Sequence, residues 1–159
     1  MIYYRISAHL SPNQPPIFKG DKFRLAKMAL KSFVGAFSDI KPQMYVLFDN
    51  CGKDYLEMFK KECPFDFKYE FTTYGNYNSC LKQYLLADKN KDEMFLFIED
   101  DYLWRKGAGK YMISAIKELG IVTPYDNPDF YISEPYKSRK EMETLIIIGH
   151  TLLELEKIP

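Results

Sequence analysis

The chain has 159 residues, of which 47% are hydrophobic and 16% aromatic, so it is long and apolar enough to fold around a core and is not a disordered chain. Its 22 basic and 22 acidic side chains cancel, and no block of Lys and Arg stands out, which argues against a protein that mainly binds duplex DNA or RNA. The three cysteines form an odd set without CxxC spacing, so neither a disulfide framework nor a zinc site is expected.

Strands and helices are expected to alternate along the first part of the chain. Residues 2–7 predict a strand, and because this start lacks the apolar run and cleavage site of a signal peptide, we expect a cytoplasmic protein. No aliphatic run is long enough for a transmembrane segment. After a proline-rich loop, Asp21 is a suitable N-cap for a helix that continues to Phe37. The next predicted elements are a strand at 44–48, a helix at 54–62, a strand at 67–71 and a helix at 79–87.

Two of these helices carry patterns that predict their buried faces. The first has apolar residues at helical spacing from Phe23 to Phe37, and Lys22 lies off this stripe together with other lysines, which predicts a solvated face. The helix at 79–87 has an apolar set that is expected to pack on the core. The members of that set are Cys80, Leu81, Tyr84 and Leu85.

The most informative stretch is residues 94–98, an apolar run that predicts a strand buried on both faces. It leads directly into Glu99, Asp100 and Asp101. Carboxylates this close together repel one another and raise one another's pKa unless positive charge lies among them. A divalent cation is the simplest source of that charge, and ligands that are all oxygens favour Mg²⁺ or Mn²⁺. The alternative is a solvated acidic turn.

The last third of the chain predicts a helix that continues to about Leu119 and ends with Gly120 as its C′ residue. A short strand at 121–123 runs into a loop that holds two prolines and two aspartates. Residues 143–158 predict either two strands joined by a turn or a single amphipathic helix.

The alternation of strands and helices predicts an α/β fold, with a mostly parallel sheet and helices on both faces. In such sheets ligands bind beyond the carboxyl ends of the strands. No Walker lysine motif and no GxGxxG motif is present, so neither a P-loop NTPase nor a dinucleotide enzyme is expected. The polar residues that follow the predicted strands are Ser7, His9, Asp49, Asn50, Asn76, Ser79, Glu99, Asp100, Asp101 and Asp126.

The run Phe97-Ile98-Glu99-Asp100-Asp101-Tyr102-Leu103 resembles the acidic metal motif, often called DxD, of GT-A-fold glycosyltransferases, and it is most similar to family 2-like members. Further pieces match in the same order, and together they cover about residues 2–131. These pieces are Ile2-Tyr3-Tyr4-Arg5-Ile6-Ser7, Phe48-Asp49-Asn50, Gly75-Asn76-x-x-Ser79 and the stretch from Thr123 to Tyr131.

The resemblance implies a Rossmann-like fold and a metal-dependent glycosyltransferase of the hexosyltransferase type, acting in glycan synthesis. Such an enzyme moves a sugar from a nucleoside-diphosphate-sugar to an acceptor hydroxyl with the help of Mn²⁺ or Mg²⁺. By this resemblance Asp101 would bind the cation directly, Asp100 and Glu99 would support it through water or hold the ribose, and Asp49 would bind the base. The residues that would line the nucleotide pocket are Ser7, His9, Asn76 and Ser79.

The sequence departs from the family pattern in its length, since such domains usually continue further and the catalytic base tends to lie in the later part. We expect a single domain over residues 1–159, which is a compact donor-binding core, a truncated product, or a partner that needs another chain for the acceptor half. Apolar surface left exposed by a missing portion would favour a homo-oligomer. Asp126 and Asp129 are the acids of the later loop, and Asp126 is the better candidate of the two for the base, although it also suits a turn before Asn127-Pro128. Trp104 would either stack on a sugar or anchor its loop on the core.

The main alternative is a non-catalytic module that binds a nucleotide sugar without turning it over. A second alternative, a metal-dependent nucleotidyltransferase or phosphatase, needs a nucleophile or a basic cluster at the strand ends, where only Arg5 and the Arg105-Lys106 pair are available. A receiver-like domain usually has an acidic pair after its first strand, and Ser7 and His9 stand there instead.

Overall fold

The computed structural model describes residues 1–9, 18, 20–90, 94–120 and 122. The chain divides into two compact units, Met1–Lys106 and Gly107–Pro159. The expectation of a single domain therefore stays a prediction. The elements of the first unit are β1 (Ile2–Ser7), α1 (Lys22–Phe37), β2 (Met44–Asp49), α2 (Lys53–Glu62), β3 (Phe67–Thr72), α3 (Gly75–Asn90) and β4 (Leu96–Glu99), and the second unit contains α4 (Ala108–Leu119).

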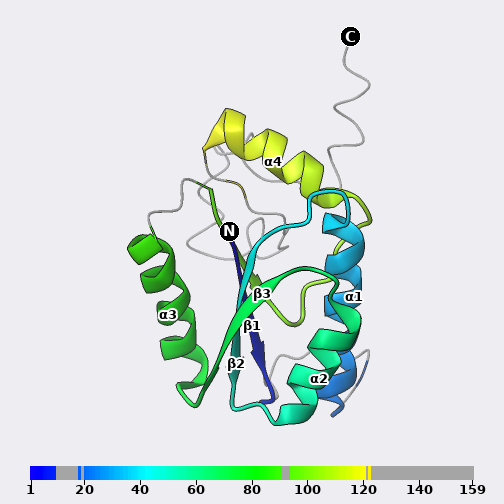
Figure 1. Cartoon of the computed structure of the whole chain (residues 1–159), viewed down its shortest axis with the longest axis vertical. Helices are drawn as coiled ribbons and strands as arrows, with labels where there is room; N and C mark the ends of the chain where they lie inside the picture. Colours follow the sequence, from blue (N-terminus) through cyan, green and yellow to red (C-terminus); the bar gives the residue numbers. More distant parts are fainter. Residues whose placement is uncertain (10–17, 19, 91–93, 121, 123–159) are drawn as a thin grey trace, which may run out of the picture. The chain divides into compact units, whose positions relative to one another are not determined.

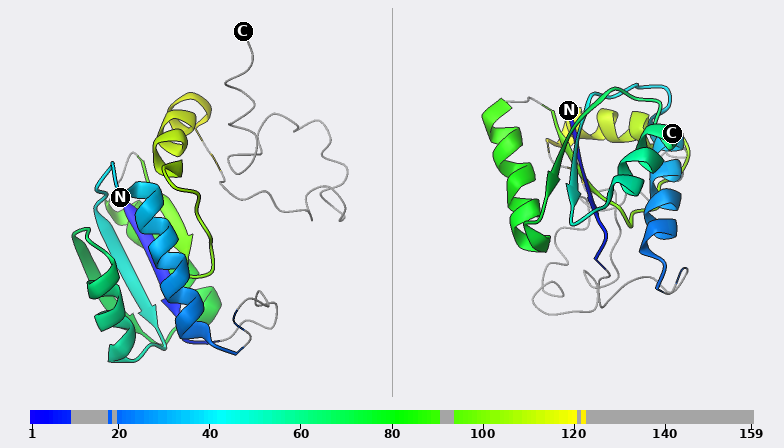
Figure 2. Two further views of the ribbon diagram at one scale, coloured as in Figure 1. Left: turned by 90° about the vertical axis from the view of Figure 1, so that its right-hand side faces the viewer. Right: turned by 60° about the horizontal axis from the view of Figure 1, so that its bottom comes forward.

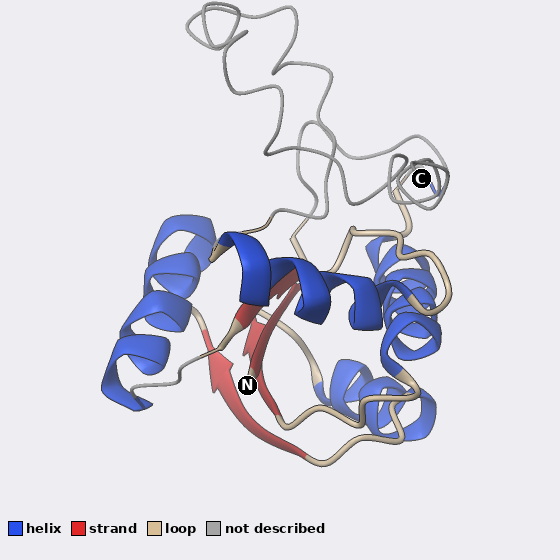
Figure 3. Ribbon diagram, turned by 90° about the horizontal axis from the view of Figure 1, so that it is seen from above, coloured by secondary structure: helices blue, strands red, loops and turns tan. Residues whose placement is uncertain are grey.

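The first unit is built on a four-stranded sheet with the strand order β3-β2-β1-β4. Every neighbouring pair of strands is parallel. The strands lie between α1 and α2 on one face and α3 on the other (Figure 1). Figure 2 shows α1 running along the strands, and Figure 3 shows the strands of the first unit from above, with its helices on both sides of them. The expected α/β fold, with a parallel sheet and helices on both faces, is confirmed.

The main core lies between the sheet and the pair α1 and α2. Successive strand residues point to opposite faces, so Tyr4 of the central strand β1 faces this core. Its ring packs edge-on against Phe33 of α1 and Phe59 of α2, with centroid distances of 5.5 and 5.4 Å. All three side chains are fully buried. These aromatic contacts explain why the apolar stripe of α1 is turned toward the sheet.

The predicted ends of two helices are confirmed. The Asp21 carboxylate caps α1 by accepting a hydrogen bond from the backbone N–H of Arg24 at 2.9 Å. In the second unit α4 ends at Gly120, which has a φ of 80° and donates its N–H to the carbonyl of Ile116 at 2.9 Å. A positive φ is readily adopted only by glycine, which is why glycine ends the helix here.

The prediction for α3 was wrong in its start and in its buried face. The helix begins at Gly75 and buries Ser79, Gln83 and Ala87, while Leu81, Tyr84 and Leu85 are 41, 52 and 58% exposed. The reason is the sheet face beneath it, where polar groups need partners. Gln83 donates to the Tyr3 carbonyl at 2.8 Å, so the polar stripe and not the apolar one lies against the strands.

The acidic strand β4 is shorter and less buried than its apolar run predicted. It spans Leu96–Glu99, and only Ile98 is fully buried, while Phe95 just before the strand is 42% exposed. β4 stands at the end of the described sheet with β1 as its only strand neighbour there, so one of its sides lacks a strand to cover it.

Several predictions fall on residues that lie outside the described part. They concern the strand at 121–123 except for Val122, the loop with Asp126 and Asp129, and the segment 143–158. Among the helices that the structure describes, none is both long enough and apolar enough to cross a membrane.

Candidate functional site

The acidic triplet is divided by the geometry of β4. Glu99 is the last residue of the strand and faces α3, whereas Asp100 points to the opposite face of the sheet. Glu99 forms an ion pair with Arg5, and Asp100 forms an ion pair with Lys22 at 2.8 Å. Two protein cations, one from each face, therefore supply the positive charge that the sequence pattern required.

Lys22 was predicted to be solvated, and that prediction was wrong. Its side chain is only 9% exposed, and that of Asp100 is 7% exposed. Lys22 is the first residue of α1, directly after the N-cap Asp21, and its ion pair with Asp100 locates it at the carboxyl edge of the sheet. The other oxygen of Asp100, Oδ2, accepts the backbone N–H of Ser7 at 2.9 Å. Asp100 thus links the end of β1 and the start of α1 to the end of β4.

Burial has a measurable consequence for Asp100. It raises the pKa of this carboxyl above its usual value, although Lys22 and the Ser7 N–H favour the charged form. Desolvation of a carboxylate can outweigh an ion pair when both partners leave water. Asp100 is therefore a buried structural acid with both oxygens engaged, and binding a cation there would have to share or replace these contacts.

Arg5 organises the other face of the edge. It is only 6% exposed and lies in the central strand β1. Its Nη1 donates to the Asn76 carbonyl at 2.8 Å, to Ser79 Oγ at 3.1 Å and to the side-chain oxygen of Asn76, while Nη2 pairs with Glu99. Arg5 therefore fastens the first turn of α3 to β1 and β4.

These contacts define what Asn76 and Ser79 do in this structure. Both were expected to line a nucleotide pocket, but here they hold the Arg5 guanidinium. Ser79 has no exposed surface, and its hydroxyl donates to the Gly75 carbonyl at 2.7 Å. Asn76 is exposed and open to a ligand from outside. Contact of either residue with a nucleotide stays a prediction.

Asp49 occupies the end of β2 and caps α3 from there. Its Oδ1 accepts hydrogen bonds from the Tyr74 N–H at 2.7 Å, the Thr72 hydroxyl at 2.9 Å and the Gly75 N–H at 3.2 Å. Its Oδ2 accepts from the Asn50 amide at 3.2 Å. Because Oδ1 already accepts three hydrogen bonds, only Oδ2 has capacity left for the predicted contact with a base. Asp49 as a whole is only 1% exposed.

Replacing Asp49 with alanine should lower the free energy of unfolding by roughly 2–3 kcal/mol, because two backbone donors and a buried hydroxyl lose their acceptor. Asp49→Asn keeps one acceptor oxygen and should cost less. Urea denaturation followed by circular dichroism measures both, with Asp66→Ala, which removes an exposed carboxylate, as the matched control. A loss equal to that of the control would show that the cap contributes nothing.

Asp101 is the carboxylate with spare capacity. Its Oδ1 is buried and accepts no hydrogen bond in the described part of the chain. Buried polar atoms without a partner are rare in folded proteins, so this oxygen calls for an explanation such as water or an ion. The negative charge of these acids also affects Tyr4. Burial raises the pKa of the Tyr4 hydroxyl, and repulsion from Asp100 and Asp101 raises it further. A hard cation is a suitable partner for such an oxygen.

The described residues include no group of three or more His, Cys, Asp or Glu side chains arranged to hold a metal ion. A cation bound at Asp101 would therefore take most of its ligands from elsewhere. Mg²⁺ is commonly held in this way, by one or two carboxylates together with waters and the phosphates of a substrate. The donor set fits a metal that arrives with a phosphorylated ligand and does not fit a permanent protein-only metal site.

His9 lies on the loop after β1, whereas Trp104 lies on the segment after β4 and packs on the second half of α1. His9 is exposed and donates its backbone N–H to Ser7 Oγ at 3.3 Å, so its imidazole is available to a ligand. Trp104 packs edge-on against Phe37 at a centroid distance of 5.4 Å, and its backbone N–H donates a hydrogen bond to Ser32 Oγ at 3.0 Å. Of the two interpretations of Trp104, these contacts favour the anchor.

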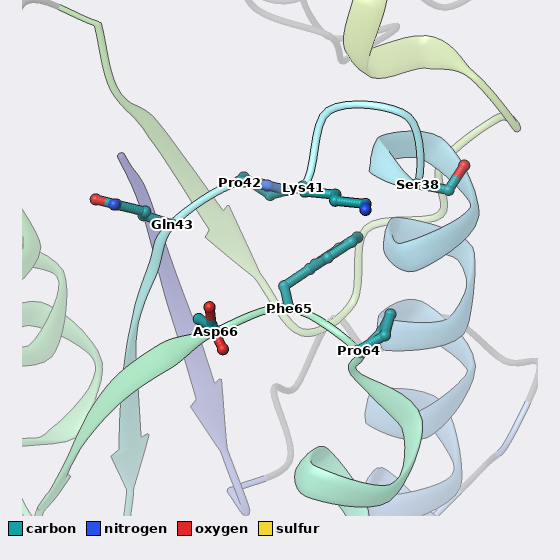
Figure 4. Close-up of a pocket in the computed structure, with 7 residues that line it drawn as sticks. All are labelled: Ser38, Lys41, Pro42, Gln43, Pro64, Phe65 and Asp66. Atoms are coloured by element: carbon teal, nitrogen blue, oxygen red, sulfur yellow. The ribbon is translucent and has the colours of Figure 1, made fainter.

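A cavity of about 260 Å³ lies at the other end of the strands (Figure 4). Gln43 and Asp66, which directly precede β2 and β3, contribute to its wall. The cavity is smaller than typical ligand pockets, which start at about 300 Å³. Because it opens at the amino ends of these strands, it is no part of the acidic edge. The full lining consists of Ser38, Lys41, Pro42, Gln43, Pro64, Phe65 and Asp66.

Sequence reasoning missed the roles of Arg5 and Lys22. The signal for Arg5 was present, because a charged residue inside an otherwise apolar strand must find a partner when the strand is buried. No comparable signal marked Lys22, since one lysine at the start of a helix suits solvent equally well.

Comparison with known proteins adds no family to these observations: neither a family model, nor a curated protein, nor a solved structure matches the chain. The geometry itself establishes an α/β unit whose parallel strands bring Ser7, Asp49, Glu99, Asp100 and Asp101 to one edge.

Proposed function

We propose that the carboxyl edge of the sheet binds a nucleoside-diphosphate-sugar together with Mn²⁺ or Mg²⁺, and that the chain is a metal-dependent glycosyltransferase. The observation that carries the proposal is the buried Oδ1 of Asp101, which has no hydrogen-bond partner in the described part of the chain although ion pairs neutralise the two acids before it. The resemblance to the DxD motif supplies the reaction type.

Each residue of the edge has a role in this proposal. Asp101 binds the cation, which neutralises the diphosphate and stabilises it as the leaving group. Glu99 is about one-third exposed, at 35%, and can accept a hydrogen bond from a ribose hydroxyl while Arg5 holds the Glu99 carboxylate in place. Lys22 and the Ser7 N–H hold Asp100, and this fixes the end of β4, next to Asp101, against the end of β1. In this proposal His9, which is exposed on the loop after β1, contacts the nucleotide.

Removing the charge of Asp101 should abolish metal-dependent binding of the donor. We expect Asp101→Asn to weaken the binding of the preferred nucleoside diphosphate in the presence of Mn²⁺ by at least about 100-fold, which corresponds to ~2.7 kcal/mol. Asparagine keeps the size of the side chain but is a much poorer cation ligand. Calorimetric titration of a panel of nucleoside diphosphates, with and without Mn²⁺, measures this effect.

The matched control is Asp66→Asn, an exposed aspartate at the opposite ends of the strands, which should bind as wild type does. Equal binding by Asp101→Asn and wild type, or no binding of any nucleotide under any condition, would disprove the donor site. Release of nucleoside diphosphate from the sugar donor then separates an enzyme from a binding module. In the enzyme, Asp126 is the proposed base, and it lies outside the described residues.

A further inference from the structure

The edge strand β3 has an open side. It stands at the end of the sheet and pairs with β2 only, and no other described strand pairs with its outer side. Lys68, Tyr69 and Phe71 are exposed, the two aromatic residues by 46 and 43%. An exposed edge with apolar side chains is a template for pairing with another strand.

The backbone groups of β3 that are free to pair can be identified from its bonds to β2. Met44 donates to the Asp66 carbonyl and Asn50 donates to the Thr72 carbonyl. Because backbone groups alternate in direction along a strand, the even-numbered residues point to β2 and the odd-numbered ones point outward. The outward N–H and C=O groups therefore belong to Phe67, Tyr69 and Phe71.

We infer that two copies of this chain pair antiparallel through β3, about a two-fold axis at Tyr69, to form a continuous eight-stranded sheet. In this register Tyr69 lies opposite Tyr69 of the second copy, and Phe67 lies opposite Phe71. All three outward-facing residues then exchange both backbone hydrogen bonds, so every outward donor and acceptor of the strand is satisfied. The exposed aromatic rings form one row across the axis, where such cross-strand pairs stabilise a sheet.

Charge complementarity identifies the second copy as the occupant of the edge. In the same register Lys68 lies opposite Glu70 of the second copy, and Glu70 lies opposite its Lys68. These are positions without backbone bonds, where the Cα atoms approach to about 4.5 Å and side chains are close. A shift of the axis by two residues, to Phe71, places Glu70 opposite Thr72 and removes both ion pairs. The strand Phe67–Thr72 is thus complementary to itself in one register.

The alternative edge, β4, lacks this property. It has four residues, Leu96–Glu99, with one charge and no basic side chain.

In β3, Glu70 also has partners within its own chain, Lys82 at 3.5 Å and the Tyr45 hydroxyl at 3.1 Å. They hold its carboxylate on the face where Lys68 of the second copy would arrive. The β3 edge is therefore the better candidate for a symmetric contact.

The test is the oligomeric state of the full chain, measured by sedimentation equilibrium at protein concentrations from about 1 to about 300 µM. The range is wide because an interface made by one pair of strands is small and therefore weak. Wild type should dimerise. Lys68→Glu and Glu70→Lys should each weaken the dimer by about tenfold or more, because two attractive pairs become repulsive. A 1:1 mixture of these two variants should restore dimerisation, since the charges are again opposite in the mixed pair. The double variant Lys68→Glu/Glu70→Lys should also dimerise.

Lys61→Glu, at an exposed residue of α2, is the matched control and should dimerise as wild type does. A wild type that stays monomeric over the whole range would overturn the inference. So would a dimer that neither single variant weakens, or a mixture of the two that dimerises no better than each alone. Nucleotide binding has no part in this experiment, so its outcome is independent of the proposed function.

Discussion

Lys22→Met should lower the free energy of unfolding by about 3–5 kcal/mol, because it leaves the Asp100 carboxylate buried without its cation. Both side chains are less than one-tenth exposed, and their charged atoms are 2.8 Å apart. Methionine keeps much of the length of lysine and can fill the same space. The lost stability therefore reports the missing charge and not a cavity, and urea denaturation at pH 7 measures it.

A double-mutant cycle isolates the pair. Lys22→Met combined with Asp100→Leu removes both charges, and it should cost less than either single substitution, since no unpaired charge stays buried. Lys61→Met is the control at an exposed lysine and should leave the free energy of unfolding unchanged within error. If the losses from the two single substitutions simply add in the double variant, the ion pair contributes nothing to stability.

The pH dependence provides a second test of the same pair. The pKa of Asp100 is raised by burial, so the folded protein holds this proton more tightly than the unfolded chain does. The contribution of Asp100 to stability therefore decreases as the pH rises from its unfolded pKa, about 3.9, through its raised folded pKa. Without Lys22 the charged form becomes still less favourable. The loss caused by Lys22→Met should consequently shrink as the pH is lowered toward 4, and an equal loss at pH 4 and pH 7 would contradict this assignment.

Arg5→Leu should be nearly as damaging, with a loss of about 2–4 kcal/mol. The buried guanidinium holds Asn76 and Ser79 of α3 and Glu99 of β4, and its removal leaves the Ser79 hydroxyl buried without this donor. The upper end of the range for a buried pair is reduced here because Glu99 is about one-third exposed, at 35%.

Arg5→Lys is the informative companion to this variant. A lysine has one nitrogen, which cannot reach α3 and Glu99 together, so most of the loss should remain. Arg24→Leu, at an exposed arginine of α1, should change the free energy of unfolding much less. Chemical denaturation measures the loss, and hydrogen exchange of the α3 amides locates it. A lysine variant as stable as wild type would show that the forked geometry is unimportant.

The sequence predicted the elements of the first unit well, because their signals are local. The expected strands at 44–48 and 67–71 each extend one residue further in the structure, and β1 has the predicted bounds. Gly52 and Pro64 mark the ends of α2, and Asp21 caps α1 as predicted. Caps, breakers and apolar runs act within a few residues, so they can be recognised without the fold.

The faces of the elements could not be predicted in the same way. The apolar residues of α3 were expected to be inside, but Arg5 on the sheet and Ser79 on the helix decide which stripe is buried. Such a preference arises from hydrogen bonds between segments more than 70 residues apart in the chain. Periodicity shows that a helix has two faces and does not show what each will meet.

By itself the sequence determined the alternation of strands and helices, the parallel sheet that this implies, and the gathering of Ser7, Asp49 and the acidic triplet at one edge. Only the tertiary structure decided how the charges of that triplet are compensated. The alternation of side chains in β4 sends Glu99 to Arg5 and Asp100 to Lys22 on opposite faces, and leaves Asp101 with a buried oxygen that has no described hydrogen-bond partner. The physical reason is that ion pairs form through space, so their partners are set by packing and not by distance along the chain.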